Sequence, residues 1–399
     1  MILILINFIS RIGIKIPHAL YYSSTRMVLA ATTTLVITIM FGKYFIKKLY
    51  ELKIGHTVRV SDIPILSANY QKSGDVPSMG GILFLASILI SAILWLDLKH
   101  SFSFILILTT LSMGILGGVD DYLKIKKNNS VGITSRKKLF FQVCLSSLLG
   151  LYLFCPYVSE FFYEKVDVIP PYAKMKVISE MKIKTFTTSE YSSIYFIPFL
   201  KKPLILSGLS IIIAFFITIL VVSGSINAVN LTDGLDGLAS GLVLLVAFVL
   251  AVFAFVSNNI IISQYLNILY IEGSSEIAIY LCATMGACLG FLWFNGYPAQ
   301  VFMGDIGSLA LGGIIGVSAV LLRREILLAL VGGVFVAETM SVILQVISFK
   351  LRGGKRIFNC APLHHHFEIS GWHEVKVVIR FWMIGLILAL IGLASLKIQ

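Results

Sequence analysis

The chain has 399 residues, of which 57% are hydrophobic and 13% are charged, and its formal net charge is +12. A soluble protein of this length would carry about twice that charged fraction, so the composition excludes a soluble globular protein and predicts a polytopic membrane protein. The basic excess does not indicate nucleic-acid binding, because the lysines and arginines cluster beside apolar runs, as charges that flank membrane spans do.

Apolar runs that are long enough to cross a bilayer as helices recur along the chain, and they predict an all-α membrane protein with one domain over residues 1–399. We expect ten spans, at about 27–48, 78–97, 101–119, 138–155, 204–223, 237–256, 277–294, 308–322, 326–349 and 377–396. In residues 1–25 the basic residues follow the apolar stretch, which is unlike a cleavable signal peptide. This segment is expected to lie at the membrane interface as an amphipathic lead-in.

Two departures from simple helical spans are expected. The ninth run contains Gly332-Gly333 together with Glu338 and Gln345, so this span is predicted to be broken or kinked. The long connection 156–203 has alternating stretches such as Lys182–Thr188, which predict a short hairpin.

The charges also predict an orientation. Loops 51–77, 120–137 and 350–376, which follow odd-numbered spans, are rich in lysine and arginine, whereas most basic residues on the other side lie in 156–203 among glutamates and aspartates. The positive-inside rule therefore predicts that the odd side is cytoplasmic, that both termini lie outside, and that 156–203 is an outer-face insertion.

The polar groups that could carry chemistry all fall on the odd side of this topology. They lie in Lys72–Gly81, in Gly117–Lys124 with Asp120-Asp121, in Asn227–Ala239, in the stretch from Asn295 to Asp305, and in the run Pro362–Glu368 with three consecutive histidines. This coincidence predicts a single site at that face. Carboxylate and amide oxygens without nearby thiols, beside lysines and histidines, favour Mg²⁺ with a phosphate-bearing substrate.

Each group also has a simpler interpretation. The aspartates could be solvated helix ends or caps, as Asp305 between two glycines illustrates. Lys72 could be an ordinary solvated lysine, the histidines an exposed basic loop, and the mid-span Glu338 a structural residue that faces the bundle interior.

Taken together, the five segments resemble the phospho-N-acetylmuramoyl-pentapeptide-transferase (MraY) family. The resemblance runs from about residue 20 to the C-terminus, with the motifs in family order. The wider superfamily of polyprenyl-phosphate N-acetylhexosamine-1-phosphate transferases shares the aspartate motifs, whereas the Pro-Leu-His-His-His-Phe-Glu run is specific to the muramoyl branch. The connection 156–203 departs from the family pattern, because it is longer than usual.

The resemblance implies a ten-span homodimer in the inner (cytoplasmic) membrane of a bacterium, with its active site on the cytoplasmic face. Such an enzyme transfers phospho-MurNAc-pentapeptide from UDP-MurNAc-pentapeptide to undecaprenyl phosphate, which gives lipid I and UMP, with Mg²⁺ as the cofactor. The kinked ninth span is expected to shape a groove for the polyprenyl tail.

Roles for individual residues are implied in the same way. Asp305 is expected to be the principal Mg²⁺ ligand with support from Asp121, and Asp120 to deprotonate or orient the lipid phosphate. Phe302 is expected to stack on uracil. The substrate-binding residues that the family motifs imply are Lys72, Lys124, Lys138, Asn230, Leu231, Asp233, Gly234, Asp236, Asn295, Phe302, His364, His365 and His366.

Two other functions stay open. An enzyme of the same superfamily that uses UDP-GlcNAc would share the aspartates, but the triple histidine argues against it. A nucleotide-sugar or lipid-phosphate transporter would place its polar site near the bilayer midplane between inverted repeats, whereas here the polar groups collect at one face and no repeat is found.

Overall fold

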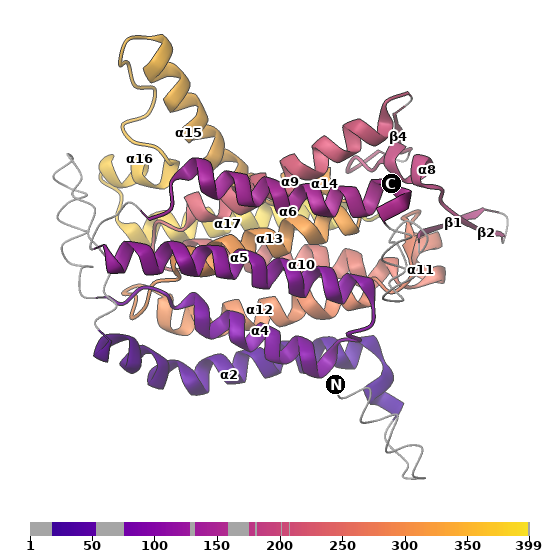
Figure 1. The fold of residues 1–399 in the computed structure, drawn as a ribbon, viewed down its shortest axis with the longest axis horizontal. Helices are drawn as coiled ribbons and strands as arrows, with labels where there is room; N and C mark the ends of the chain where they lie inside the picture. The colour runs from indigo at the N-terminus through magenta and orange to yellow at the C-terminus, as the bar shows by residue number, and fades with distance from the viewer. Residues whose placement is uncertain are drawn as a thin grey trace.

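The computed structural model describes residues 18–52, 76–127, 132–158, 175–179, 182–200, 202–206 and 208–397. Within them, long helices lie side by side in one bundle, and short strands gather at one end of it (Figure 1). The helices are η1 (His18–Tyr21), α2 (Ser23–Glu51), α4 (Gly81–Trp95), α5 (Ser101–Lys126), α6 (Ser135–Phe154), α8 (Thr188–Ser193), α9 (Ser210–Thr232), α10 (Leu238–Ser257), α11 (Ile260–Tyr265), α12 (Ser275–Asn295), α13 (Gly304–Leu321), α14 (Glu325–Val331), α15 (Gly333–Leu351), α16 (Leu363–Ile369) and α17 (Glu374–Ala394).

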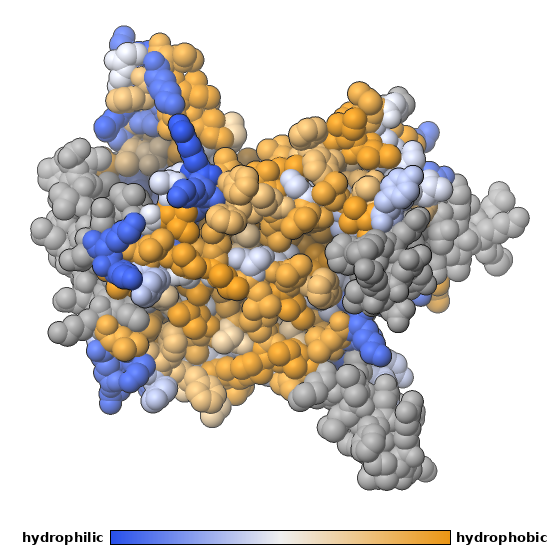
Figure 2. Space-filling model, viewed as in Figure 1, coloured by the Kyte–Doolittle hydropathy of each residue, from blue (hydrophilic) through white to orange (hydrophobic). Residues whose placement is uncertain are grey.

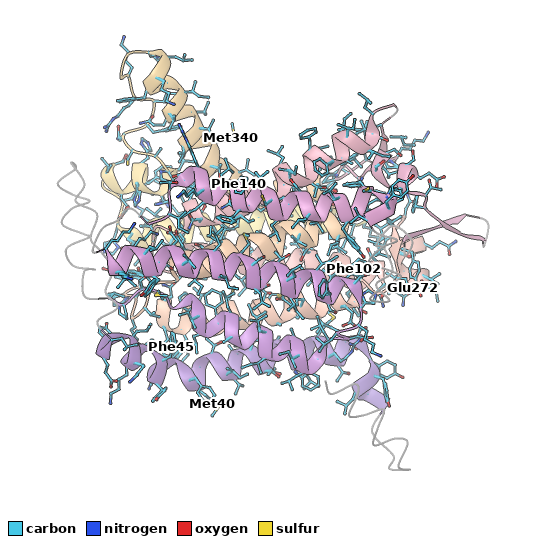
Figure 3. The ribbon with its side chains drawn as sticks, in the orientation of Figure 1. Met40, Phe45, Phe102, Phe140, Glu272 and Met340 are labelled. Carbon is cyan, nitrogen blue, oxygen red and sulfur yellow. The ribbon has the colours of Figure 1, made fainter. Side chains whose placement is uncertain are left out.

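The structure confirms the prediction of an all-α polytopic membrane protein. Among the described residues, nine helices are long and apolar enough to cross a membrane, namely α2, α5, α6, α9, α10, α12, α13, α15 and α17. Met40 on α2 and Met340 on α15 are exposed on the bundle surface, whereas Phe102 is fully buried (Figure 3). On the face shown in Figure 2, the surface of the bundle between its two ends is correspondingly apolar.

The second predicted span contains a shorter helix than expected. Helix α4 has 15 residues, or about 22 Å at 1.5 Å per residue, against the roughly 30 Å of a bilayer core. The residues before it are held by a loop instead of by helical hydrogen bonds. Phe302 N donates to Pro77 O (2.9 Å), Gly80 N to Phe302 O (2.8 Å), and Gly81 N to Met303 O (2.9 Å).

Two helices extend further into the predicted polar loops than expected. Helix α5 continues past the predicted end at 119 to Lys126, and α9 continues past 223 to Thr232. The polar side chains in these last turns find partners inside the protein, as Asn227 does when it donates to Gln142 Oε1 (2.6 Å) and Ser223 O (2.8 Å). Asp120, Asp121 and Asn230 therefore project from helices.

The predicted break in the ninth span lies at Gly332. Helix α14 ends at Val331, and α15 begins at Gly333, with Gly332 between them at φ −83° and ψ 19°. Beyond the break, α15 leans away from the other helices (Figure 1). The buried residues of α15 are Val334, Phe335, Glu338, Ser341 and Ser348.

The predicted hairpin in the connection 156–203 is present as well. Strand β1 (Met175–Ser179) pairs antiparallel with β2 (Lys182–Thr185) and with β5 (Tyr270–Ile271), and β3 (Ile194–Tyr195) pairs with β4 (Leu204–Ile205). These strands lie at the end of the bundle opposite the C-terminus of α5 (Figure 1).

A buried arginine joins this end to the ninth span. Arg323, between α13 and α14, donates to Glu325 Oε1 (2.9 Å) and to Ile194 O (2.5 Å). Its guanidinium lies over the rings of Tyr191 and Tyr195, at 4.7 and 4.5 Å from their centroids. Such stacking satisfies a cation in an apolar setting, so the insertion is anchored to the bundle.

The bundle is built around α13. Every residue of this helix from Gly307 to Leu321 is buried, and α5 and α9 pack along it (Figure 1). The N-terminus of this central helix is therefore held firmly, and Asp305 lies in its first turn.

We expect the buried ion pair Arg26–Glu276 (2.9 Å) to stabilise the fold. Glu276 Oε2 also accepts a hydrogen bond from Asp97 N (2.8 Å), which ties α2, α12 and the end of α4 together. Glu276→Ala leaves a buried arginine uncompensated and should cost about 3–5 kcal/mol. Thermal unfolding of the detergent-purified variant should show a lowered midpoint.

The exposed pair Lys48–Glu51 (3.1 Å) provides the matched control. Glu51→Ala should cost less than about 1 kcal/mol, because solvent screens an exposed pair. Equal midpoints for the two variants would contradict a stabilising role for Glu276.

Candidate active site

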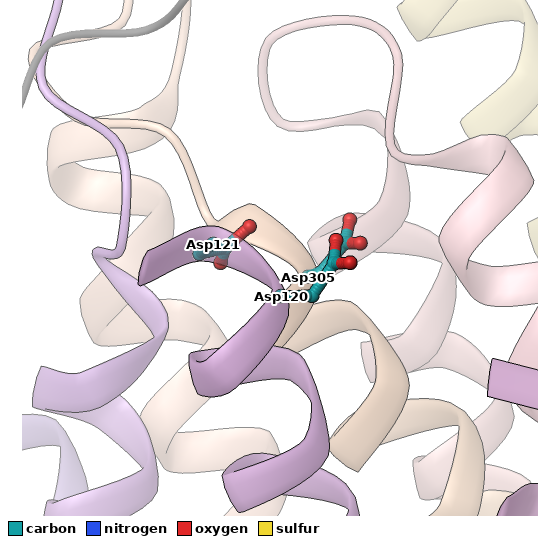
Figure 4. A group of neighbouring side chains, drawn as sticks. All are labelled: Asp120, Asp121 and Asp305. Carbon is teal, nitrogen blue, oxygen red and sulfur yellow. The ribbon is translucent and has the colours of Figure 1, made fainter. Parts of the chain in front are cut away.

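Three carboxylates converge where α5 ends and α13 begins. Asp120 and Asp121 project from the last two turns of α5, and Asp305 projects from the first turn of α13 (Figure 4). One carboxylate oxygen from each lies within 4.8 Å of the others. Like charges at this separation repel, so the cluster requires cations or protons.

Asp305 is contacted from three neighbouring helices. Its Oδ2 accepts hydrogen bonds from Lys124 of α5 (2.9 Å) and from Lys138 of α6, and its Oδ1 accepts one from Asn230 of α9 (3.0 Å). No side-chain cap bond is made at this helix start, so Asp305 is not the helix cap that its sequence context allows. Its side chain is 15% exposed, the most of the three aspartates.

Asp120, by contrast, is fully enclosed. Its side chain is 0% exposed, and Lys124 and Lys138 each lie 2.7 Å from its Oδ2. Its Oδ1 accepts a hydrogen bond from Ile133 N (2.5 Å). A solvated helix end is therefore excluded for Asp120, whose contacts are with the two lysines and with the backbone of Ile133.

Asp121 supports the start of α13. Its Oδ2 accepts a hydrogen bond from Ile306 N (3.1 Å), and its Oδ1 lies 3.6 Å from Lys124 Nζ. Gly304 makes this approach possible: its φ is +73°, and a Cβ there would lie 2.5 Å from Asp121 Oδ2.

The cations of this cluster are Lys124, which lies one turn after Asp120 and Asp121 on α5, and Lys138 on the neighbouring helix α6. Three aspartates against two lysines give the cluster a formal charge of −1. Carboxylate oxygens in close proximity, with no thiol or imidazole among them, are the ligands that Mg²⁺ takes. The donor set of these three aspartates could therefore hold a metal ion such as Mg²⁺.

The loop after α9 carries two further predicted site residues. Asp233 is half-buried, and burial together with the nearby carboxylates of Asp305 and Asp121 raises the pKa of Asp233 to about 8. Asp236 accepts a hydrogen bond from Ala299 N (2.9 Å), and burial raises the pKa of Asp236 as well. Asp236 thus braces its loop against the loop that precedes α13.

Asn295 braces the same two loops. Its Oδ1 accepts a hydrogen bond from Gly237 N (3.0 Å), and its Nδ2 donates to Val301 O (2.9 Å). Its side chain is buried. Asn295 therefore holds the two loops together, in addition to the role in nucleoside binding that the resemblance implies.

The three histidines have three different surroundings. His364 is buried, and its Nδ1 lies 3.2 Å from Glu338 Oε1; burial lowers the pKa of His364. His365 Nδ1 lies 2.7 Å from Glu368 Oε2. His366 Nδ1 accepts a hydrogen bond from Asn359 N (3.1 Å), so in neutral His366 the proton is on Nε2.

Four predicted site residues remain. Phe302 and Leu231 are half-buried, and Gly234 is exposed. The backbone of Phe302 is fixed by Pro77 and Gly80. Lys72 lies outside the described residues.

Two residues that contact the predicted site residues are not among the sequence predictions. Ser308 Oγ accepts a hydrogen bond from Asn230 Nδ2 (2.9 Å), and Glu374 Oε1 accepts one from Asp236 N (3.0 Å). Ser308 lies in the Gly304–Ser308 run, one turn after Asp305, where its spacing on a helix could have indicated it. Glu374 lies in a segment without a motif.

Comparisons with known proteins identify relatives of this chain. A family model described as glycosyl transferase family 4 matches residues 103–323. Relatives named phospho-N-acetylmuramoyl-pentapeptide-transferase are similar over nearly the whole chain. The one from Protochlamydia amoebophila is 54% identical over 100% of both chains, and the one from Brachyspira hyodysenteriae is 44% identical over 95% of each. The relative from Thermodesulfovibrio yellowstonii is 43% identical over 95% of this chain and 94% of its own.

We expect the acidic cluster to bind a divalent cation without any substrate. Asp305→Asn keeps the side-chain volume but removes a charged ligand, and it should weaken the affinity for Mn²⁺ by about tenfold or more. Mn²⁺ shares the oxygen preference of Mg²⁺ and can be titrated by EPR with the purified protein. Asp97→Asn, at an exposed position far from the cluster, is the control, and equal affinities in both variants would remove Asp305 from the metal site.

Proposed function

Because the chain belongs to the phospho-N-acetylmuramoyl-pentapeptide-transferase family, we propose that it transfers phospho-MurNAc-pentapeptide from UDP-MurNAc-pentapeptide to undecaprenyl phosphate. The products are lipid I and UMP. The protein is a multi-pass membrane phosphoglycosyl transferase. In this proposal it works in the inner membrane of a bacterium, as a homodimer, with its site on the cytoplasmic face.

The observation that carries the proposal is the contact of Asp305 with Lys124 (2.9 Å) and Lys138 beside two more carboxylates. Both substrates carry phosphate groups, and an acidic site alone would repel them. Lysines at 21% and 17% exposure can turn from the aspartates toward phosphate oxygens as these arrive. In this proposal the same two lysines neutralise the aspartates when no substrate is present, and they bind phosphate groups when the substrates arrive.

In this proposal Asp305 and Asp121 would hold Mg²⁺. When bound, the ion neutralises charge on the phosphoryl group that is transferred. Asp305 is suited to this part because it is the most accessible of the three carboxylates. Asn230 fixes its orientation from α9.

The reaction exchanges one phosphoanhydride for another. An oxygen of the lipid phosphate attacks the phosphorus that bears the sugar, and the bond from that phosphorus to UMP breaks. A phosphate monoester loses its second proton with a pKa of about 6, so the attacking group is largely ionised at neutral pH. A strong base is therefore not required, and positioning and electrostatics can supply most of the catalysis.

The buried position of Asp120 favours the orienting role over the deprotonating one. Its Oδ1 accepts a hydrogen bond from Ile133 N, and its Oδ2 lies 2.7 Å from the ammonium groups of both Lys124 and Lys138. It holds these lysines next to Asp305, where they can meet the phosphates. To accept a proton, Asp120 would first have to lose one of these contacts.

Release of UMP by the purified protein tests the proposal. Undecaprenyl phosphate and Mg²⁺ are supplied, and UDP-MurNAc-pentapeptide and UDP-GlcNAc are offered in parallel. We expect release only with the muramoyl donor, loss of release on chelation, and no turnover by folded Asp305→Asn. Release only with UDP-GlcNAc would move the activity to the other branch of the superfamily, and no release with either donor would contradict a transferase of this specificity.

Phe302 offers a separate test of the nucleotide pocket. Stacking of a base on an aromatic ring contributes about 1–3 kcal/mol, so Phe302→Ala should raise the KM for the UDP donor by about fivefold or more. The fold should survive, because Phe302 binds Pro77 and Gly80 through its backbone. Phe140→Ala, at an exposed position on α6, serves as the control, and an unchanged KM in the Phe302 variant would remove this ring from the pocket.

A further inference from the structure

Helix α15 is largely exposed, yet it carries a fully buried carboxylate. Glu338 is 0% exposed, whereas Val336 and Met340 on either side of it are 42% and 44% exposed. A carboxyl group inside a membrane-spanning helix is costly and requires partners. The prediction that Glu338 faces the interior of the bundle is confirmed, and there it contacts His364.

The contact between Glu338 and His364 joins α15 to the histidine run. Glu338 Oε1 accepts a hydrogen bond from His364 N (3.2 Å) and lies 3.2 Å from His364 Nδ1. The imidazole is 1% exposed and packs edge-on against the ring of His365, with centroids 4.2 Å apart. One carboxylate oxygen therefore binds the backbone of His364 and also lies next to its ring.

The far edge of this ring meets the loop after α9. A Cβ on Gly234 would lie 2.3 Å from His364 Nε2, which is closer than any side chain tolerates. The loop after α9 therefore lies directly against the imidazole, and a larger residue at position 234 would displace the ring.

That loop is firmly bonded, and it borders the acidic cluster. Gly237 N donates to Asn295 Oδ1 (3.0 Å) and Asp236 N donates to Glu374 Oε1 (3.0 Å), while Asp236 Oδ2 accepts from Ala299 N (2.9 Å). At its start lies Asp233, three residues after Asn230, which binds Asp305. A shift of His364 would thus be transmitted to both ends of the loop.

We propose that Glu338 is a positioning residue for the transfer reaction: through His364 and Gly234 it sets the position of residues 233–237. It couples the exposed half-helix α15 to the side of the site that would receive the UDP donor. This inference rests on the proposed function for its kinetic consequence. The coupling itself is a property of the protein without substrate.

Hydrogen–deuterium exchange of the full-length protein in detergent tests the coupling without turnover. Glu338→Leu keeps the side-chain size but removes the acceptor, and it should speed exchange at residues 233–237. Glu338→Gln retains an acceptor oxygen and should preserve protection, as should the control Met340→Leu. Exchange that is unchanged at 233–237 in Glu338→Leu, or raised equally throughout α10, would overturn the proposal.

Steady-state kinetics then separate positioning from packing. Loss of the contact should raise the KM for the UDP donor by about tenfold in Glu338→Leu, while the KM for undecaprenyl phosphate changes by less than about twofold. Gly234→Ala should have a similar effect, and the double variant should be no worse than either single one, because both act through His364. A change in the lipid KM alone, or multiplicative effects in the double variant, would make Glu338 a packing residue of α15.

The two hypotheses fail in different ways. A wild-type protein that transfers neither donor contradicts the proposed function, and the exchange result still decides whether Glu338 positions the loop. Normal wild-type transfer together with unchanged kinetics in Glu338→Leu contradicts the positioning role alone.

Discussion

The carboxylate of Asp305 is the point on which the arrangement of helix ends depends. Asp305 lies in the first turn of the central helix α13, and its carboxylate accepts hydrogen bonds from Lys124 of α5, Lys138 of α6 and Asn230 of α9. A half-buried carboxylate at the end of an apolar bundle requires such compensation. The same contacts that stabilise the fold therefore bring together the groups that the proposed chemistry needs.

A second layer of contacts holds the loops around this centre. Asp236 and Asn295 connect the loop after α9 to the loop before α13, and the latter pairs with residues 77–81. From the other side, Glu338 contacts His364, and the ring of His364 lies against Gly234. The proposed lipid side and nucleotide side of the site thus share a continuous set of hydrogen bonds and close contacts, although they lie on different helices.

Much of the fold follows from local patterns. Long apolar runs specify spanning helices because each helix satisfies its own backbone hydrogen bonds in lipid, and Gly332-Gly333 indicated the break that separates α14 from α15. The exact helix ends did not follow. The polar stretch Asn227–Thr232 was predicted as a loop, yet it is helical, because partners such as Gln142 come from another helix.

For the site, the sequence by itself determined which residues were candidates, through motifs such as Asp120-Asp121 and the triple histidine and through their predicted placement on one face. Only the tertiary structure decided how these residues differ. Asp120 is enclosed and Asp305 is accessible, and His364 is buried against Glu338 while His366 is oriented by Asn359. The burial and pairing of these side chains depend on residues from other parts of the chain, and the local spacing of a motif does not predict them.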